Sequence, residues 1–503
     1  MNEANRKWWV LAAMTTCISM IFIDITVLPV TLPTISRELN ASQLALQWII
    51  NAYLLTLSSL LLAGGRLGDM LGHRKIFCWG LLVFSLSSAL CGLSPSEGWL
   101  IGSRAFQGAG GALLLPATNA ILFSAFPPSQ RGKALGLYVS IGSIFLILGP
   151  VIGGFFTEYW SWRYVFWINL PIAGAGLFLA LLSVPISSKV EESFDFIGFI
   201  TLASGIGCLV VAFMQVEKWG WESPWTISLL LLGILAIALL VILDRKVEHP
   251  IVDFSIFKSR RVIGANFCLF CTQFLLMCTI FWPIYFQNIL EFSPATAGMI
   301  SFISSSPILF VSPIGGYLLD RFGPKPSLIS GFILLIFSLV WFIFAAATYR
   351  FLMLLPTLIF FGCGTSLIFT ASSITALSDI VPHKRGIASA LTLTIRQLGG
   401  AIGMAAAGSL FIGTEKKSFT ALTRNLSPSK LFSFERFDGL LSQAPSALEA
   451  LHELPQETIK IVETSYKEAF MTAFSSVNAL SAWMGLLGLI AVLLLIKKGV
   501  LKS

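Results

Sequence analysis

Three ionisable side chains stand inside long apolar stretches, and they are the residues best placed for chemistry. They are Asp24, Arg104 and Arg396. An ionised group buried unpaired in a membrane costs at least several kcal/mol, so such residues pair with one another or mark the path of protons, ions or substrates. A buried carboxylate can also take up and release a proton. The pattern therefore indicates proton exchange as the first chemistry to consider.

The depths of these residues indicate which of them can meet. At about 1.5 Å per residue, Asp24 lies roughly 24 Å from the inner end of the first predicted span, and Arg104 lies about 8 Å from the outer end of the fourth. In a hydrocarbon core about 30 Å thick the two depths agree, so the side chains can meet in one cavity and exchange a proton for a cationic substrate. The alternative is a structural buried ion pair. Gln107, one turn after Arg104, belongs to the same candidate site.

Arg396 is the corresponding candidate in the later part of the chain. It lies about 15 Å into its own predicted span, near the middle of the membrane. At that depth its guanidinium either lines a cavity or packs near a helix end.

The elements that must position these residues are membrane-spanning helices. Of the 503 residues, 56% are hydrophobic and 12% are charged, against about 25% charged in a soluble domain. Apolar runs of about 20 residues recur without the alternation of barrel strands, so they are helices. The sequence predicts an all-α polytopic membrane protein with fourteen spans, near residues 8–30, 46–64, 75–93, 99–121, 133–157, 164–184, 196–215, 224–243, 262–286, 296–318, 327–347, 351–375, 386–411 and 469–496.

The basic residues predict which way the chain crosses the membrane. If the amino terminus is inside, most of the 33 Lys and Arg residues fall in short cytoplasmic segments, where the positive-inside rule places them. We therefore expect both termini on the cytoplasmic side of the plasma (inner) membrane. The first apolar stretch is too long for a cleaved signal peptide, so it is retained as a span. The net charge of +8 fits an anionic inner leaflet and gives no reason to expect nucleic acid.

Two short motifs occur twice, which indicates a duplicated membrane domain. Gly-x-Leu-x-Asp-x-x-Gly ends at Gly72 and again at Gly323, and Pro-x-x-Arg-Gly-x-Ala-x-x-Leu starts at Pro128 and again at Pro382. The copies lie about 250 residues apart, which is about two helices more than a six-helix repeat requires. Repeats of this kind are typical of secondary transporters. We predict a six-helix bundle in 1–190, two inserted helices in 191–258, and a second six-helix bundle in 259–503 with an outer loop at about 412–468.

Glycine-rich segments predict where the bundles approach each other. In the first motif, glycines permit a tight cytoplasmic turn, and Asp69 can hold the two bundles together. The gating residues of this motif are Gly65, Asp69, Gly72 and Arg74, with Asp320 and Arg321 in the second copy. A second segment contains Gly149, Pro150, Gly153 and Gly154. Its proline interrupts helical hydrogen bonding, so this segment forms either a pliable point or a close-packed joint.

These motifs resemble those of the major facilitator superfamily. The similar segments are GRLGDMLGHRK, the fourth-span segment around Arg104 and Gln107, LGPVIGG around Gly149, and SWRYVFWINLP. With fourteen spans and RQLGGAIG around Arg396, the chain resembles the fourteen-helix drug:proton antiporter family, the EmrB/QacA-like branch. Two features depart from the family pattern: Met70 and His73 replace usual basic residues, and Phe145 stands at a glycine position of the antiporter motif.

The resemblance implies a secondary active transporter with the major facilitator fold, two six-helix bundles plus two inserted helices. It implies export of amphipathic or lipophilic small molecules in exchange for protons by alternating access. The expected partners are a small-molecule substrate, protons and membrane lipid, with a periplasmic adaptor if the source has a double membrane, and no cofactor beyond the proton gradient. The alternative is a transporter of one specific endogenous metabolite, because the same fold supports both functions.

A membrane enzyme is the remaining class, and the sequence gives it little support. No Ser/His/Asp set, metal cluster or phosphate-binding loop is recognisable, and the four histidines lie in predicted loops. The ninth span carries an aromatic set that either lines a broad apolar cavity or has a lipid-facing or core role: Phe274, Trp282, Tyr285 and Phe286, with Gln287 and Asn288. The sequence thus favours a transporter over an enzyme.

Overall fold

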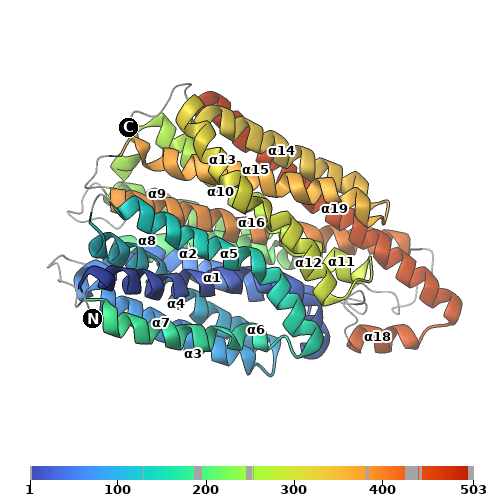
Figure 1. Cartoon of the computed structure of the whole chain (residues 1–503). Helices are drawn as coiled ribbons and strands as arrows, with labels where there is room; N and C mark the ends of the chain where they lie inside the picture. Colours follow the sequence, from blue (N-terminus) through green and yellow to red (C-terminus); the bar gives the residue numbers. More distant parts are fainter. Residues whose placement is uncertain are drawn as a thin grey trace.

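A computed structural model of the chain describes residues 3–127, 130–185, 195–244, 252, 254–380, 385–424, 440 and 445–496. Within these residues the regular structure is helical. The described residues contain fourteen helical segments long and apolar enough to cross a membrane, which confirms the predicted all-α polytopic fold. They run side by side, with the start of α1 and the end of α19 at one end of the molecule and α18 at the other (Figure 1). We call these the terminal end and the α18 end.

Six spans form the first half of the molecule. Within it, α1 packs against α5 and α7, and α4 packs against α2 and α3. The sixth span is divided at Ile168 into α6 and α7. The helices are α1 (Glu3–Leu39), α2 (Gln43–Leu71), α3 (His73–Gly92), α4 (Glu97–Ala125), α5 (Arg131–Tyr159), α6 (Tyr164–Trp167) and α7 (Asn169–Ser183).

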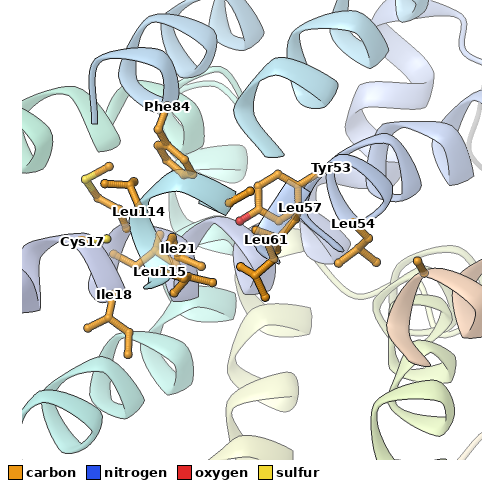
Figure 2. Packing of buried hydrophobic residues seen from close by; sticks show 14 of the residues in the cluster. Cys17, Ile18, Ile21, Tyr53, Leu54, Leu57, Leu61, Phe84, Leu114 and Leu115 are labelled. Atoms are coloured by element: carbon orange, nitrogen blue, oxygen red, sulfur yellow. The ribbon is translucent and has the colours of Figure 1, made fainter. Parts of the chain in front are cut away.

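Apolar side chains fix α4 against α2 in this half. Tyr53, Leu57 and Leu61 follow one face of α2 at the spacing of one helical turn, and all three are buried. Figure 2 shows them beside Leu114 and Leu115 of α4. Because this core holds the two helices in register, it also sets the position of Arg104 and Gln107, which lie about two to three turns earlier on α4.

Two further helices and a second set of six spans complete the described chain. The first pair, α8 and α9, pack on each other, and α8 also contacts α2 and α16. The second set is arranged around α10, which contacts α15, α16 and α19. These elements are α8 (Phe196–Trp219), α9 (Pro224–Asp244), η2 (Phe254–Lys258), α10 (Arg260–Leu276), η3 (Met277–Ile280), α11 (Phe281–Asn288), α12 (Pro294–Ser305), α13 (Pro307–Phe322), α14 (Pro324–Ala346), α15 (Phe351–Ser378), α16 (Arg385–Leu422) and α19 (Gln456–Leu495).

The segment expected as an outer loop at 412–468 is helical at both of its ends. Residues 412–422 continue α16, and residues 456–468 begin α19. Between them lies the short helix α18 (Pro445–His452). These three elements share a small apolar core containing Phe419, Leu451 and Tyr466. The connector between the last two spans is therefore shorter than predicted, because an additional core beyond the spans supports longer helices.

The backbone repeats the duplication seen in the motifs. The turn from α2 to α3 has Gly72 at φ 95°, and the turn from α13 to α14 has Gly323 at φ 80°, a region that favours glycine. A second equivalence joins the α3–α4 pair, where Gly80 and Gly110 meet, to the α14–α15 pair, where Gly331 and Gly364 meet. The remaining repeated motif starts at Pro128 and Pro382, which lie outside the described residues.

The two halves meet along two pseudo-symmetric seams, α5 with α12 and α2 with α16. Three hydrogen bonds that cross between the halves lie toward the α18 end. Gln47 Nε2 donates to the Gly408 carbonyl (2.9 Å), Gln287 Nε2 to the Val30 carbonyl (2.8 Å), and the Ala295 N–H to Glu158 (2.8 Å). The halves are therefore joined at the α18 end in this conformation.

Candidate functional site

The structure brings Asp24 and Arg104 into direct contact in the first half. Arg104 Nη1 donates to Asp24 Oδ2 at 2.6 Å, and Gln107 Nε2 donates to Asp24 Oδ1 at 2.8 Å. Both oxygens of the carboxylate thus accept charge-assisted or amide hydrogen bonds. The side chain of Asp24 is 0% exposed and that of Arg104 is 2% exposed. This is a closed ion pair rather than a carboxylate facing water.

Polar groups from four other elements complete the surroundings of the pair. Arg104 Nε donates to the Ile49 carbonyl of α2, and Arg104 Nη1 also donates to Gln107 Oε1. Gln107 Nε2 donates further to Ser88 Oγ of α3, which also accepts from Asn169 Nδ2 of α7 and donates to the Phe166 carbonyl of α6. The network extends from α1 through α4 to the sixth span. Because these hydrogen bonds form one connected network, removal of any one member is expected to destabilise the fold.

Two aromatic rings pack against the arginine of the same pair. The Arg104 guanidinium carbon lies 4.3 Å from the centroid of the Tyr53 ring and 5.9 Å from that of Phe166. Cation–π attraction is stronger where water is excluded, so the rings stabilise the cation that the carboxylate neutralises. Sequence reasoning did not select Tyr53, Ser88 or Asn169 as site residues. The available signal was weak, because isolated hydroxyl and amide side chains are common in apolar helices.

Arg396 stands in a different environment in the second half. Its guanidinium carbon lies 5.5 Å from the ring centroid of Phe369 on α15. Its Nε is buried without a hydrogen-bond acceptor, while the side chain as a whole is partly exposed. Within the described part of the chain no carboxylate lies within ion-pair distance of it. The structure therefore does not bring Arg396 together with Asp24 and Arg104.

The aromatic residues of the ninth span belong to the core. Phe274, Trp282, Tyr285 and Phe286 are all buried. Trp282 makes edge-on contacts with Phe342 and Phe361, each with ring centroids 4.8 Å apart. Of the roles left open by the sequence, the structure supports packing of these aromatic residues in the core.

The glycine turn at the terminal end holds Asp69 in contact with its own half. Asp69 Oδ1 lies 3.2 Å from His73 Nε2, one turn along the chain, and the Asp69 side chain is half exposed. Arg74 Nη2 donates to the Leu181 carbonyl of α7, and Gly65 faces Pro116 of α4. Among the described residues, Asp69 has no ion-pair partner in the other bundle in this conformation. His73, which replaces a usual basic residue, is instead the local partner.

The second copy of this turn is only partly described. Arg321 Nη1 donates to the Tyr317 hydroxyl at 2.7 Å, and both residues are exposed. The side chain of Asp320 lies outside the described residues. The comparison between the two copies therefore rests on the shared glycine backbone and not on the acidic side chains.

The glycines around Pro150 form a close-packed joint at the α18 end. A methyl group added at Gly149 or Gly153 would overlap α1, at Thr26 and Val27 respectively. One added at Gly154 would overlap the carbonyl of Pro294 on α12. Pro150 also presents its carbonyl to Gly298 of α12. The segment thus joins α5 both to α1 of its own half and to α12 of the other half.

A polytopic helical protein made of two similar bundles, with a buried ion pair in one and closely packed seams between them, belongs to the class of secondary transporters. The chain matches the Major Facilitator Superfamily over residues 14–198 and 196–404. It therefore belongs to this superfamily and is a membrane transporter, not an enzyme.

Curated relatives show the range of named functions around this chain. Multidrug resistance protein Stp of Mycobacterium tuberculosis is 30% identical, covering 78% of this chain and 73% of that protein. Puromycin resistance protein pur8 of Streptomyces alboniger is 32% identical, covering 81% and 82%. Riboflavin transporter RibZ of Clostridioides difficile is 30% identical, covering 81% and 89%.

Solved structures support the fold. A bacterial homolog of the human lysosomal transporter Spinster, in an inward-facing and occupied conformation, superposes with a TM-score of 0.65. It is 16% identical, and the match covers 96% of this chain and 97% of that chain. At this identity the similarity concerns the arrangement of helices alone.

Proposed function

We propose that the chain exports amphipathic or lipophilic small molecules in exchange for protons, by alternating access. The observation that carries this proposal is the closed Asp24–Arg104 pair, a single buried carboxylate balanced by a single buried cation. The resistance proteins among the relatives support efflux as the direction of transport.

Proton binding to this pair changes the energy of the first half by a large amount. When Asp24 is ionised, it neutralises Arg104 and accepts from Gln107. When Asp24 is protonated, Arg104 becomes an uncompensated buried charge, a situation that typically costs about 3–5 kcal/mol. The guanidinium must then find water or another acceptor, which requires α1 and α4 to shift. Protonation is thereby coupled to a change in helix packing.

The helix that carries Asp24 also contacts the joint between the halves. Thr26 and Val27 follow Asp24 on α1 and pack against Gly149 and Gly153 of α5. The same α5 segment packs against α12 of the second half through Gly154. A shift of α1 on protonation therefore acts on the seam that closes the α18 end. In the proposed cycle, this movement of α1 couples protonation of Asp24 to the opening and closing of the substrate pathway.

Transport into proteoliposomes driven by an imposed pH gradient tests the coupling. We expect Asp24→Asn to abolish gradient-driven transport while the folded protein stays in the membrane. Because Asp24→Asn leaves Arg104 unpaired, the double variant Asp24→Asn, Arg104→Gln is the stability-matched control, and it should fold as the wild type does yet remain uncoupled. If the single variant still moves substrate uphill with the wild-type pH dependence, Asp24 is not the proton site.

A carrier of one specific endogenous metabolite is the second candidate function. The similarity to the riboflavin transporter favours it. A panel of structurally unrelated compounds distinguishes the two functions in the same proteoliposomes. Competition by many of them supports a broad exporter, whereas transport of a single compound class supports a metabolite carrier.

The orientation belongs to the same proposal. Export with a cytoplasmic amino terminus places the terminal end of the bundle in the cytoplasm of a plasma or inner membrane and the α18 end outside. Glu449 on α18 is exposed, and Lys75 is exposed at the opposite end. A cysteine at position 449 should react with an impermeant thiol reagent added to intact cells, and one at position 75 should react only after lysis. The reverse pattern would invert the topology. A periplasmic adaptor is a further predicted partner for a double-membrane source.

A further inference from the structure

We infer that Arg396 binds the anionic group of the transported compound, so that the substrate class includes amphipathic molecules bearing a carboxylate or a similar oxyanion. This inference rests on the proposed transport function and specifies the chemistry of its substrate. It concerns a site in the second half, separate from the Asp24–Arg104 pair.

Arg396 offers donors that the described residues do not use. Among the described residues, no side-chain or backbone acceptor is hydrogen-bonded to its guanidinium, and its Nε is buried without a partner there. Arginine presents its N–H donors in a planar fork that matches a carboxylate. An arginine inside a span normally faces the bundle interior and finds a counter-charge. A ligand that supplies the missing oxyanion would satisfy both requirements.

The position of Arg396 in the fold places the guanidinium inside the bundle. α16 is surrounded by α2, α8, α10 and α19. Gly399 and Gly403, on either side of the next helical turn, pack closely on Phe270 and Phe274 of α10. The guanidinium then reaches Phe369 on α15. The guanidinium therefore lies between α16 and α15, and α10 contacts both of these helices.

Two neighbouring groups suit the rest of an amphipathic anion. The Phe369 ring faces the guanidinium and provides an apolar surface next to the charge. Gln273 of α10 lies beside α16 one helical turn beyond Arg396, since a methyl group added at Gly400 would be 3.3 Å from its Cγ and 3.6 Å from its Nε2. Gln273 is partly exposed and its amide has no hydrogen-bond partner among the described residues. Together, Arg396 provides a cation, Gln273 a neutral hydrogen-bond donor and Phe369 an aromatic ring.

The charges around the transport core favour an anion over a cation. The one carboxylate that the described structure places deep in the first half, Asp24, is fully buried and already neutralised by Arg104. Arg396, the partly exposed ionic group described at mid-span in the second half, is positive. A cationic substrate would meet repulsion at Arg396, whereas an anionic one would remove an unpaired charge. In the proposed orientation, anion export with proton import also moves net positive charge inward, so the membrane potential adds to the driving force.

Binding of a matched acid and ester tests the inference without a proton gradient. The probes are pyrenebutyrate and its methyl ester, which share an aromatic body and differ by one negative charge at neutral pH. Binding of each to the purified full-length protein in detergent is measured by fluorescence. A hydrogen-bonded charge contributes enough for about a tenfold to hundredfold difference in Kd. We therefore expect the wild type to bind the acid at least about tenfold more tightly than the ester.

Variants then assign this preference to one residue. Arg396→Gln should remove the preference for the acid and leave ester binding unchanged, whereas Arg396→Lys should keep part of the preference. Arg350→Gln, at an exposed arginine outside the spans, is the control for general surface charge and should behave as the wild type. If Arg396→Gln does not fold, Gln273→Leu is the second variant, and it should weaken acid binding more than ester binding.

The outcomes separate this inference from the proposed function. Equal binding of acid and ester by the wild type, or an acid preference that survives Arg396→Gln, would overturn the anion site. An unchanged ratio in Gln273→Leu, where only that variant folds, would overturn it as well. Acid preference together with an absence of proton-driven transport would support the site and reject the antiport mechanism. Proton-driven transport of both the ester and the acid at equal affinity would support the antiport mechanism and reject the anion site.

Discussion

The two halves of this transporter share a backbone but differ in the chemistry at equivalent positions. At the spacing of the repeated motifs, Ser88, Arg104 and Gln107 of the first half correspond to Leu339, Leu358 and Phe361 of the second. The first set carries the ion-pair network, and the second set is buried in an apolar core. Conversely, Arg396 corresponds to Gly142, which packs against Ile18.

The two halves of the duplicated scaffold therefore have different roles. A buried ion pair is costly to build, and it stabilises the fold only while both partners remain charged. Confining it to one half lets the other half pack as a rigid aromatic core, while a lone arginine remains available to a ligand. The comparison therefore predicts a coupling half and a recognition half, which mutations should affect in different ways.

The largest effect is expected from removing the arginine of the ion pair. Arg104→Leu makes the first half resemble the second, where Leu358 is buried, but it leaves Asp24 as an uncompensated buried charge. We expect a loss of about 3–5 kcal/mol in the free energy of unfolding, measured by thermal or denaturant unfolding in detergent. Adding Asp24→Leu should restore most of the stability and leave no proton coupling.

A second ion pair provides the control for this experiment. Arg163 and Glu38 are 2.8 Å apart near the α18 end, and both side chains are partly exposed. Partly exposed pairs contribute about 1 kcal/mol or less, so Arg163→Leu should be mild. Equal losses for Arg104→Leu and Arg163→Leu would show that the buried network does not distinguish the first half.

An intermediate effect is expected at the seam between the halves. Gly154→Val would force α5 away from Pro294 of α12, and overpacking of this kind costs about 1–3 kcal/mol. We expect the population to shift away from the conformation joined at the α18 end. The measurement is a spin-label distance between Tyr159 on α5 and Glu291 of the second half, both exposed, which should increase.

Another glycine of the same helix controls for side-chain size. A methyl group at Gly136 would meet nothing within 4 Å. Gly136→Val therefore adds the same group without affecting the seam, and its distance distribution should match the wild type. An unchanged distribution in Gly154→Val would mean that the glycines of α5 serve packing alone.

The fold was largely predictable from the sequence because the membrane imposes one strong rule. Backbone groups in hydrocarbon must be bonded within the helix, so long apolar runs identify the spans, and all fourteen were found. The extensions of α16 and α19 were not predicted. They depend on an apolar core with α18, and contacts between residues far apart in sequence leave no periodic signal in either segment.

The site was predictable only in part. Depth counting identified Asp24 and Arg104 as a possible pair because a charge in a span is conspicuous. The roles of Ser88 and Asn169 depend on the rotation of α3 and α7 about their axes, which composition does not fix. The environment of Arg396 was also left open, since whether a mid-span arginine has a partner depends on which helices surround it.

The smallest effect on stability, but a clear effect on rate, is expected at the glycine turn of the first half. Asp69 is half exposed, and its ion-pair partner among the described residues is His73, so Asp69→Asn should cost less than about 1 kcal/mol in unfolding free energy. We nevertheless expect slower transport with little change in substrate binding, because the link to the other half, which the described residues do not make in this conformation, would have to form in the alternate one.

His73→Asn separates the two roles of Asp69. It removes the contact seen in this conformation but leaves the carboxylate free to pair across the halves. We expect His73→Asn to transport at close to the wild-type maximal rate and Asp69→Asn to be slower, with similar apparent KM values in proteoliposomes. If Asp69→Asn expressed normally and matched the wild-type rate, the turn would be a simple connector. If both variants were equally slow, the local Asp69–His73 contact would be the important one, and the first half would need no link across the seam at its terminal end.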